Sequence, residues 1–338
     1  MTRIFERVDH HPWRDRHHHG VGRFRNPPSP HPDGRGSAAM RKVLWTLARE
    51  GNRPLENLLP GHVWSRDQAL AALRLTPPPT LTWLGQACFY IRLPGTNLLT
   101  DPFLGERASP VPFAGPRRLV PQPLVAADLD PDVLLISHNH YDHLDRTSIR
   151  TLCGKRPVTI VTTLGTGRSL RGLGAREVIE LDWLQCVELG DVLITLTPAC
   201  HFSGRSAWDQ DRALWGGFFV ESDAGRLFFA GDSGDSDCFD RTAELLGGAD
   251  VALVPAGAYG PPEVFARVHM TPEEARQVAD RFGAREAVAM HWGTLRLTTE
   301  PFWEPRERFL AAAGRAAPVV MAIGQTRPLG LAEPPRTL

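Results

Sequence analysis

The chain has 338 residues, of which 38 are basic and 38 acidic, so its formal net charge is zero. This length suffices for one large core or two small ones, and the balanced charge gives no support to a dedicated nucleic-acid-binding protein. No apolar run approaches the roughly 20 residues of a membrane-spanning helix, and the charged, His-rich start lacks the apolar core of a secretory signal. Five scattered cysteines without a CxxC pair are expected to be reduced thiols, which indicates a cytoplasmic protein.

Residues 1–79 are predicted to form an arm and a short helix that pack on the main domain, residues 80–338. The arm, 1–36, is rich in Arg, His, Pro and Gly and is expected to be extended, with His17–His19 in a polar tail and Arg23–Pro28 as an anchor. Ser37–Arg49 are expected to form a helix with one apolar face. Packing on the protein's own core is the favoured interpretation of that face, and contact with a membrane surface is the alternative.

The main domain is predicted to contain many short strands and a few helices. Apolar runs bounded by turn residues predict strands at 81–85, 89–93, 97–100, 131–136, 158–162, 192–197, 215–221, 226–230, 251–254, 287–290 and 319–323. Helices are expected at 148–152, 165–173, 271–282 and 305–313. The third of these begins with Thr271-Pro272-Glu273-Glu274, which has the spacing of a capping box and Pro at the first helical position.

Four potential metal ligands lie within six residues directly after the predicted strand 131–136: His138, His140, Asp142 and His143. Because side chains alternate in an extended segment, His138 and His140 point the same way and can bind one metal ion. Asp142 and His143 follow a turn of the chain and can bind a second ion close by. Imidazole and carboxylate ligands together favour zinc, with iron or manganese as alternatives. A His-rich solvated loop is the competing interpretation, but such a loop rarely follows a buried strand directly.

Three later strands also end in candidate ligands, namely His201, Asp232 and His291. Each residue has an ordinary alternative: His201 as a core histidine, Asp232 as a turn residue, and His291 as a ring packed beside Trp292. Strands that place ligands on one rim of a sheet make a shared site at that rim. The joint pattern therefore predicts a binuclear centre.

These ligands and their order resemble the metallo-β-lactamase superfamily, from about residue 80 to the carboxyl terminus. Within it the chain is similar to the N-acylphosphatidylethanolamine-hydrolysing phospholipase D family. The similarity lies in the ligand cluster and in Arg23–Pro27, Leu98–Pro102, Glu106–Pro110, Phe113–Pro116, His269–Ala275 and His291–Thr294. One departure is Gln86, which stands where relatives often carry His. It lies outside the expected ligand set and is expected to affect the surroundings of the site.

The resemblance implies an αββα sandwich of two mixed β-sheets, with the metal ions at one edge. It assigns His138, His140 and His201 to one ion, Asp142, His143 and His291 to the other, and Asp232 as the bridge. Asp101 is expected to orient a ligand histidine through its ring N–H. The catalytic candidates are His269 and Asp142. His269 matches a histidine that lies near the reacting phosphate in the family, and Asp142 is one of the implied metal ligands. Asp235 and Asp237 are expected to be loop residues.

The activity expected from the resemblance is binuclear metal-dependent hydrolysis of a phosphodiester. A hydroxide bridging the ions would attack an N-acylphosphatidylethanolamine-like glycerophospholipid, so neither Ser203 nor Cys200 is needed as a nucleophile. A lactonase or another ester or phosphoester hydrolase is the alternative enzyme, and a binding protein with a vestigial site is the non-enzymatic alternative. The resemblance also leaves open a homodimer and peripheral contact at the inner membrane surface.

Overall fold

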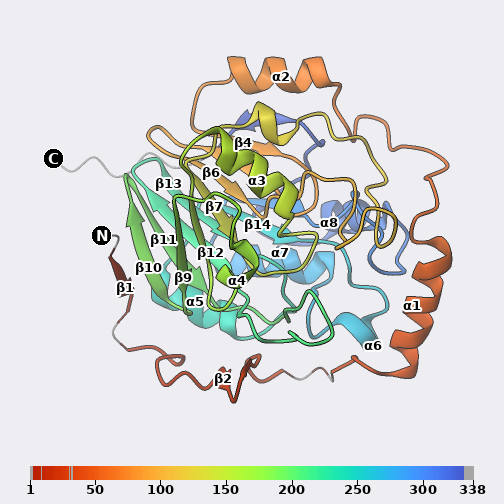
Figure 1. Cartoon of the computed structure of the whole chain (residues 1–338), viewed down its shortest axis with the longest axis horizontal. Coiled ribbons are helices and arrows are strands. Elements are labelled where there is room, and N and C mark those ends of the chain that lie inside the picture. Colours follow the sequence, from red (N-terminus) through yellow and green to blue (C-terminus); the bar gives the residue numbers. More distant parts are fainter. Residues whose placement is uncertain (1–2, 9, 30, 32, 331–338) are drawn as a thin grey trace.

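The structure is a computed structural model that describes residues 3–8, 10–29, 31 and 33–330. Two large β-sheets lie face to face, and helices cover their outer faces (Figure 1). The predicted αββα sandwich is therefore confirmed.

One sheet has eight strands, in the order β1-β10-β11-β12-β13-β14-β15-β16. It is mixed, because the strands from β1 to β13 pair antiparallel and those from β13 to β16 pair parallel. The strands are β1 (Ile4–Glu6), β10 (Gln185–Leu189), β11 (Val192–Thr197), β12 (Gly217–Ser222), β13 (Gly225–Phe229), β14 (Val251–Pro255), β15 (Glu286–Met290) and β16 (Ala317–Val319).

The other sheet has seven strands, in the order β17-β4-β5-β6-β7-β8-β9, and is also mixed. Its inner strand β7 (Val133–Ile136), between β6 and β8, is buried on both faces. Val133 and Leu135 face the other sheet, whereas Leu134 and Ile136 face the helices. This double burial explains why the segment is uniformly apolar. The remaining strands are β17 (Thr326–Pro328), β4 (Thr80–Trp83), β5 (Phe89–Arg92), β6 (Asn97–Thr100), β8 (Thr159–Thr163) and β9 (Glu177–Leu181).

The helices form the two outer layers. Those next to the seven-stranded sheet are α2 (Arg66–Leu75), α3 (Arg146–Lys155) and α4 (Gly167–Leu170), with the 3-10 turn η1 (Ala126–Asp128) beside α3. Those next to the eight-stranded sheet are α5 (Cys238–Leu246), α7 (Pro272–Arg281) and α8 (Glu304–Ala311). Thr271 forms the predicted capping box with Glu274 at the start of α7. No helix in the described ranges is both long and apolar enough to cross a bilayer.

The amino-terminal arm runs along one edge of the sandwich to α1 (Ala38–Glu50) (Figure 1). Helix α1 packs on the protein itself, since its Val43 is buried with Val264 and Phe265 of α6 (Pro262–Phe265). The predicted anchor is confirmed, since Asn26 binds the backbone of His201 through both its amide oxygen and its amide nitrogen.

The expectation of a polar tail at residues 17–19 is wrong. The His18 ring stacks on Trp183 with centroids 4.2 Å apart, and His18 and His19 bind the two carboxylate oxygens of Asp182 at 2.7 and 2.8 Å. Polar residues become buried here because a partner carboxylate satisfies them, and the partner lies more than 160 residues away in the chain. The short hairpin β2 (His19–Gly20) and β3 (Arg23–Phe24) continues the arm.

Several elements differ from the sequence expectation. The last predicted strand, 319–323, is instead β16 at Ala317–Val319, followed by β17, which was not predicted. Strands β9 and β10 and helices α2 and α5 were also not predicted. They are short or mixed in polarity, and they are stabilised by pairing or packing with distant segments rather than by local pattern.

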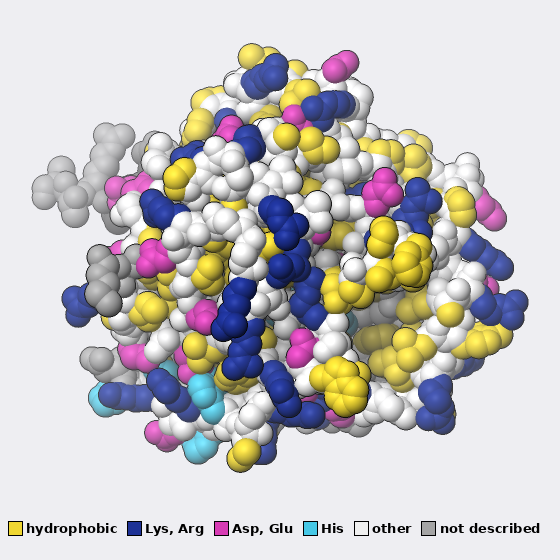
Figure 2. All heavy atoms as spheres, in the orientation of Figure 1, with side chains coloured by type: hydrophobic (Ala, Val, Ile, Leu, Met, Phe, Trp, Pro, Cys, Tyr) yellow, Lys and Arg dark blue, Asp and Glu magenta, His cyan; other side chains and the backbone are white. Residues whose placement is uncertain are grey.

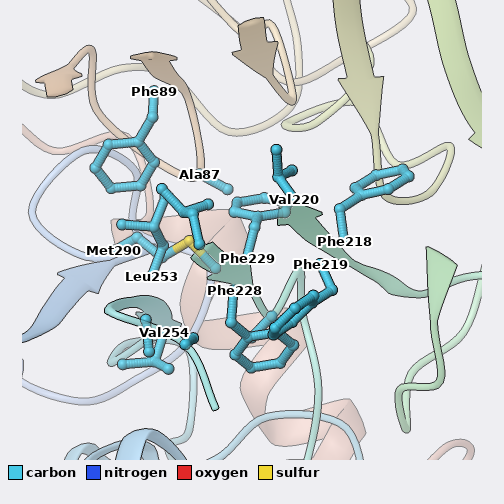
Figure 3. Close-up of a cluster of buried hydrophobic side chains, with 14 of the residues drawn as sticks. Ala87, Phe89, Phe218, Phe219, Val220, Phe228, Phe229, Leu253, Val254 and Met290 are labelled. Carbon is cyan, nitrogen blue, oxygen red and sulfur yellow. The ribbon is translucent and has the colours of Figure 1, made fainter. Parts of the chain in front are cut away.

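Aromatic side chains fill both faces of the eight-stranded sheet (Figure 3). Phe218 pairs with Phe229, and Phe219 pairs with Phe228, across β12 and β13. Phe228 and Phe219 stack on Phe282 at the end of α7, with centroids 3.9 and 6.3 Å away. Alternation along these strands therefore divides the rings between the inter-sheet core and the helix layer.

We expect Phe228→Ala to lower the free energy of unfolding by about 3–5 kcal/mol, because it opens a cavity in the densest aromatic contact. Urea denaturation measures the change. The matched control is Phe113→Ala, at a side chain that is 81% exposed, which should change stability by less than about 0.5 kcal/mol. Equal losses in the two variants would contradict this account of the core.

Candidate metal centre

The candidate site lies where strands of both sheets end. β7 leads to His138, whereas β11, β13 and β15 of the other sheet lead to His201, Asp232 and His291. The expectation that the ligands share the rim of one sheet is therefore wrong, because the two sheets contribute together. The sandwich brings the ends of strands from both sheets to one edge of the molecule.

Seven of the predicted site residues converge in two adjoining groups. One group contains His138, His140 and His201, and the other contains Asp142, His143, Asp232 and His291; within each group the potential ligand atoms lie within 4.8 Å of one another. Asp232 Oδ2 lies 3.1 Å from His143 Nε2, 3.0 Å from His291 Nε2 and 3.8 Å from His201 Nε2. This one oxygen is thus the point at which the two groups meet.

Ring nitrogens that face away from the centre are held by the protein. His143 Nδ1 lies 2.7 Å from Asp101 Oδ2, and His201 Nδ1 lies 2.9 Å from the carbonyl oxygen of Val268. The Asp101 carboxylate also accepts hydrogen bonds from the backbone N–H and the hydroxyl of Ser137. Such partners fix the orientation and tautomer of an imidazole, leaving its other nitrogen to act as a ligand.

The residues present fit a metal centre. His138 Nε2 approaches His140 Nδ1 to 2.8 Å, and His143 Nε2 approaches His291 Nε2 to 3.2 Å. Two ring nitrogens that face each other so closely in a buried site need a proton or a cation between them. In addition, Asp232 Oδ1 is buried without a hydrogen-bond partner. A buried set of imidazole nitrogens and carboxylate oxygens is the ligand set of a zinc or related transition-metal ion.

Burial and neighbouring charges give the two groups opposite protonation. Burial and the nearby His201 lower the pKa of His140 to about 3, and burial lowers that of His201 to about 4. Burial also disfavours the charged form of His291, but the carboxylates of Asp232 and Asp142 outweigh it and raise the pKa to about 9. The pKa of Asp232 falls well below its usual range, since His143 and His291 outweigh its burial.

His269, the other catalytic candidate, lies at the rim of this cluster. Its ring centroid is 5.0 Å from that of His201, and its Nδ1 is buried without a partner. Burial holds its pKa well below the ordinary value. Asp235 and Asp237 lie outside the cluster, where Asp235 pairs with Arg281 and Asp237 with Arg241.

Gln86 is a residue whose role the sequence did not reveal. Its side-chain amide donates to Asp142 Oδ2 at 3.0 Å. Its backbone carbonyl oxygen accepts from the backbone N–H of His291, also at 3.0 Å. Gln86, Asp101 and His291 all have positive φ, at 51°, 34° and 60°. Non-glycine residues adopt such angles only where the surroundings impose them, and they are frequent at functional sites.

The fold and the buried His/Asp cluster together define a metallo-β-lactamase-type protein with a site that can bind metal. Residues 96–292 match the family described as "Beta-lactamase superfamily domain". The chain belongs to this superfamily.

Relatives and solved structures agree with this assignment. An uncharacterized protein of Mycobacterium tuberculosis is 37% identical over 240 residues, which are 69% of this chain and 63% of that protein. The N-acyl-phosphatidylethanolamine-hydrolyzing phospholipase D 1 of Caenorhabditis elegans is 36% identical over 240 residues, 67% of each chain. The crystal structure of an isothiocyanate hydrolase from Delia radicum gut bacteria matches with a TM-score of 0.59 and 20% identity, covering 73% of this chain and 98% of that one. At that identity the match shows the fold alone.

We expect metal binding to depend on pH differently in the two groups. Metal binds neutral imidazole, so an ion must displace the proton of His291 at pH 7, whereas His140 and His201 are already neutral above about pH 4. Zinc titration of His140→Ala by calorimetry in several buffers should therefore release about one proton or more per ion at pH 7, with affinity rising up to about pH 9. His291→Ala should release fewer protons. Equal release by both variants would contradict the assigned protonation.

We expect Gln86→Leu to weaken metal binding by about 10–100-fold, the usual effect of removing a partner that orients a ligand. Competition with a chelator measures this loss. Gln122→Leu is the control, since its amide donates only to the backbone carbonyl of Leu124 at 2.7 Å. Unchanged affinity in Gln86→Leu would show that Asp142 needs no such support.

Proposed function

We propose that this protein is a binuclear metal-dependent hydrolase of phospholipase D type. The observation that carries the proposal is the convergence of the seven His and Asp side chains at one edge of the sandwich. Several relatives are named metal-dependent hydrolases, and the relative from Caenorhabditis elegans is named for hydrolysing N-acyl-phosphatidylethanolamine. Because the alignment spans 63% of the mycobacterial relatives, the substrate is inferred from the site and from the shared region.

In this proposal His138, His140 and His201 hold one ion, Asp142, His143 and His291 hold the second, and Asp232 bridges them. Zinc is the proposed metal, with iron or manganese compatible with the same ligands. When bound, two such ions lower the pKa of water and stabilise charge on phosphate oxygens. The buried carboxylates of Asp142 and Asp232 keep the ligand set anionic at neutral pH, since the pKa of each lies well below its usual range.

His269 is proposed to bind a phosphate oxygen rather than to act as an acid. Because burial keeps its pKa low, the ring is neutral at pH 7 and can donate a hydrogen bond through its single N–H. A phosphodiester bound beside His201 would lie within reach of this ring. His269 is thus assigned to binding the phosphate, and protonation of the leaving oxygen is left to another group.

Neither nearby nucleophile faces the cluster. Ser203 Oγ is buried and donates to the carbonyl oxygen of Ala213 at 2.6 Å. Cys200 Sγ donates to Ser236 Oγ at 3.3 Å. A direct attack by water therefore suits the site better than a covalent intermediate on the protein.

Apolar side chains lie near the site and on α1. Leu295, Leu297 and Phe302 line a small hollow beside His291 together with polar residues. Leu44 and Trp45 on α1 are 58% and 61% exposed, so this helix can contact a membrane surface while its other face packs on the protein. A peripheral location at the inner membrane surface and a homodimer remain predictions, which vesicle sedimentation and light scattering would check.

We expect Asp142→Ala and His201→Ala to lose bound metal and hydrolytic activity together, by more than about 100-fold, since each removes a direct ligand. Elemental analysis and hydrolysis of phospholipids that differ only in head group measure the two losses. Asp235→Ala, which breaks the surface pair with Arg281, is the control and should retain both.

The same assay distinguishes the competing activities. Lactones and nucleotide diesters are tested beside the phospholipids. Preferential hydrolysis of a lactone, or full activity of the metal-free variants, would contradict the proposed reaction.

A further inference from the structure

An unpaired row of arginines crosses the face beside the candidate metal centre. Figure 2 shows basic side chains gathered in a band over α3 and α4. We call this set the arginine band, and its members are Arg23, Arg146, Arg168, Arg171 and Arg212. Many other arginines pair with acidic residues, for example Arg7 with Glu221 and Arg66 with Asp128. Among the described residues, no carboxylate lies within ion-pair distance of a member of the band.

Shared contacts make the band continuous. Arg23, Arg168 and Arg212 line one hollow between the β2–β3 hairpin and α4, and Arg168 and Arg171 line the next. Arg146 donates hydrogen bonds to the backbone carbonyls of Ser169 and Arg171. The band thus extends from the arm to the first turn of α3.

Beyond Arg146 the band reaches the candidate site. Arg205 stacks over the Tyr141 ring at 3.8 Å and donates to the carbonyl oxygens of Asn139 and Leu144. Those residues belong to the loop that carries His140 and Asp142. The positive charge beside the band therefore continues to the loop that carries the candidate ligands.

Nearby carboxylates accept hydrogen bonds from other groups. Glu180, which lines the hollow of Arg168 and Arg171, accepts from the backbone N–H of Gly167 at 2.9 Å. Asp211 pairs with Arg35 at 3.0 Å, and Asp182 is held by His18 and His19. Asp209 accepts hydrogen bonds from the backbone N–H groups of its own loop. The positive charge of the band is therefore left to attract an external anion.

Two exposed apolar side chains flank the arginines. Val21, at the tip of the β2–β3 hairpin, is 102% exposed, and Trp208, in the loop between Arg205 and Arg212, is 84% exposed. Basic residues with an exposed Trp and an aliphatic tip are typical of surfaces that bind lipid head groups and insert shallowly at the interface. A polynucleotide would use the charge but would gain nothing from Val21.

We propose that the arginine band, with Val21 and Trp208, docks the protein on the surface of an anionic phospholipid bilayer. This inference deepens the proposed lipid hydrolysis, on which its biological purpose rests, by naming the surface and the charge of the lipid. Arg168 and Arg212 bind head-group phosphates, while Trp208 enters the interface. The band thereby presents the metal centre to lipids in the membrane.

The test is sedimentation of the full metallated chain with vesicles of phosphatidylcholine alone or mixed with phosphatidylglycerol. The variant is Arg168→Glu with Arg212→Glu. Since each arginine near an anionic surface contributes about fivefold in binding, affinity for the anionic vesicles should fall at least about 25-fold. Binding by the native chain should also weaken steeply with salt. Trp208→Ala should reduce binding to anionic vesicles while leaving the salt dependence in place.

A matched control carries the same change of charge elsewhere. Arg74→Glu with Arg315→Glu alters exposed residues on α2 and just after α8, and this variant should bind anionic vesicles as the native chain does. Equal binding to both vesicle types, equal loss in the control, or band-dependent binding to a short oligonucleotide without binding to vesicles would overturn the proposal.

Hydrolysis of a small soluble phosphodiester, bis(p-nitrophenyl) phosphate, separates this surface from the proposed reaction. The band variant should hydrolyse it at the native rate, because none of the altered residues touches the metal cluster. Band-dependent vesicle binding without any phosphodiester hydrolysis would refute the proposed reaction and leave the docking surface standing. Phosphodiester hydrolysis without vesicle binding would refute the docking surface and leave the proposed reaction standing.

Discussion

One buried carboxylate oxygen, Asp232 Oδ2, joins the parts of this protein that matter for its chemistry. It lies between His143 and His291, and 3.8 Å from His201. These histidines come from both sheets, so their convergence depends on the register with which the sheets pack. Buried charge is costly unless it is paired. The buried carboxylates are consequently stable only while a positive charge lies beside them, either on a protonated histidine or on a bound metal ion.

Side-chain and backbone contacts around the cluster hold its residues in position. Gln86 contacts the cluster twice, through its amide to Asp142 and through its carbonyl to His291. Asp101 binds His143 from behind, and Asn26 of the arm binds the backbone of His201. Positive φ at Gln86, Asp101 and His291 stores conformational energy, of order 1–3 kcal/mol at each residue, that the packed fold must offset. The contacts that hold the candidate ligands are therefore also contacts on which the fold depends.

The arm adds to the surface of the protein beside the sandwich. Residues that look like a polar tail are instead fastened to Asp182 and Trp183, and they place the β2–β3 hairpin next to α4. Without this attachment Arg23 and Val21 would lie far from Arg168 and Arg212. The same segment that supports His201 thus completes the basic surface beside the site.

Local sequence determined a good part of this structure. The apolar run before His138 predicted a buried strand, the Thr271–Glu274 spacing predicted the start of α7, and the dense His/Asp cluster indicated metal chemistry. Such features depend on neighbours in the chain, so periodicity and spacing carry them. Tertiary structure alone decided that two sheets share the site, that Gln86 supports Asp142, and that His18 is buried. These outcomes depend on partners 56 to 164 residues away, whose approach is set by sheet packing and leaves no periodic trace in the sequence.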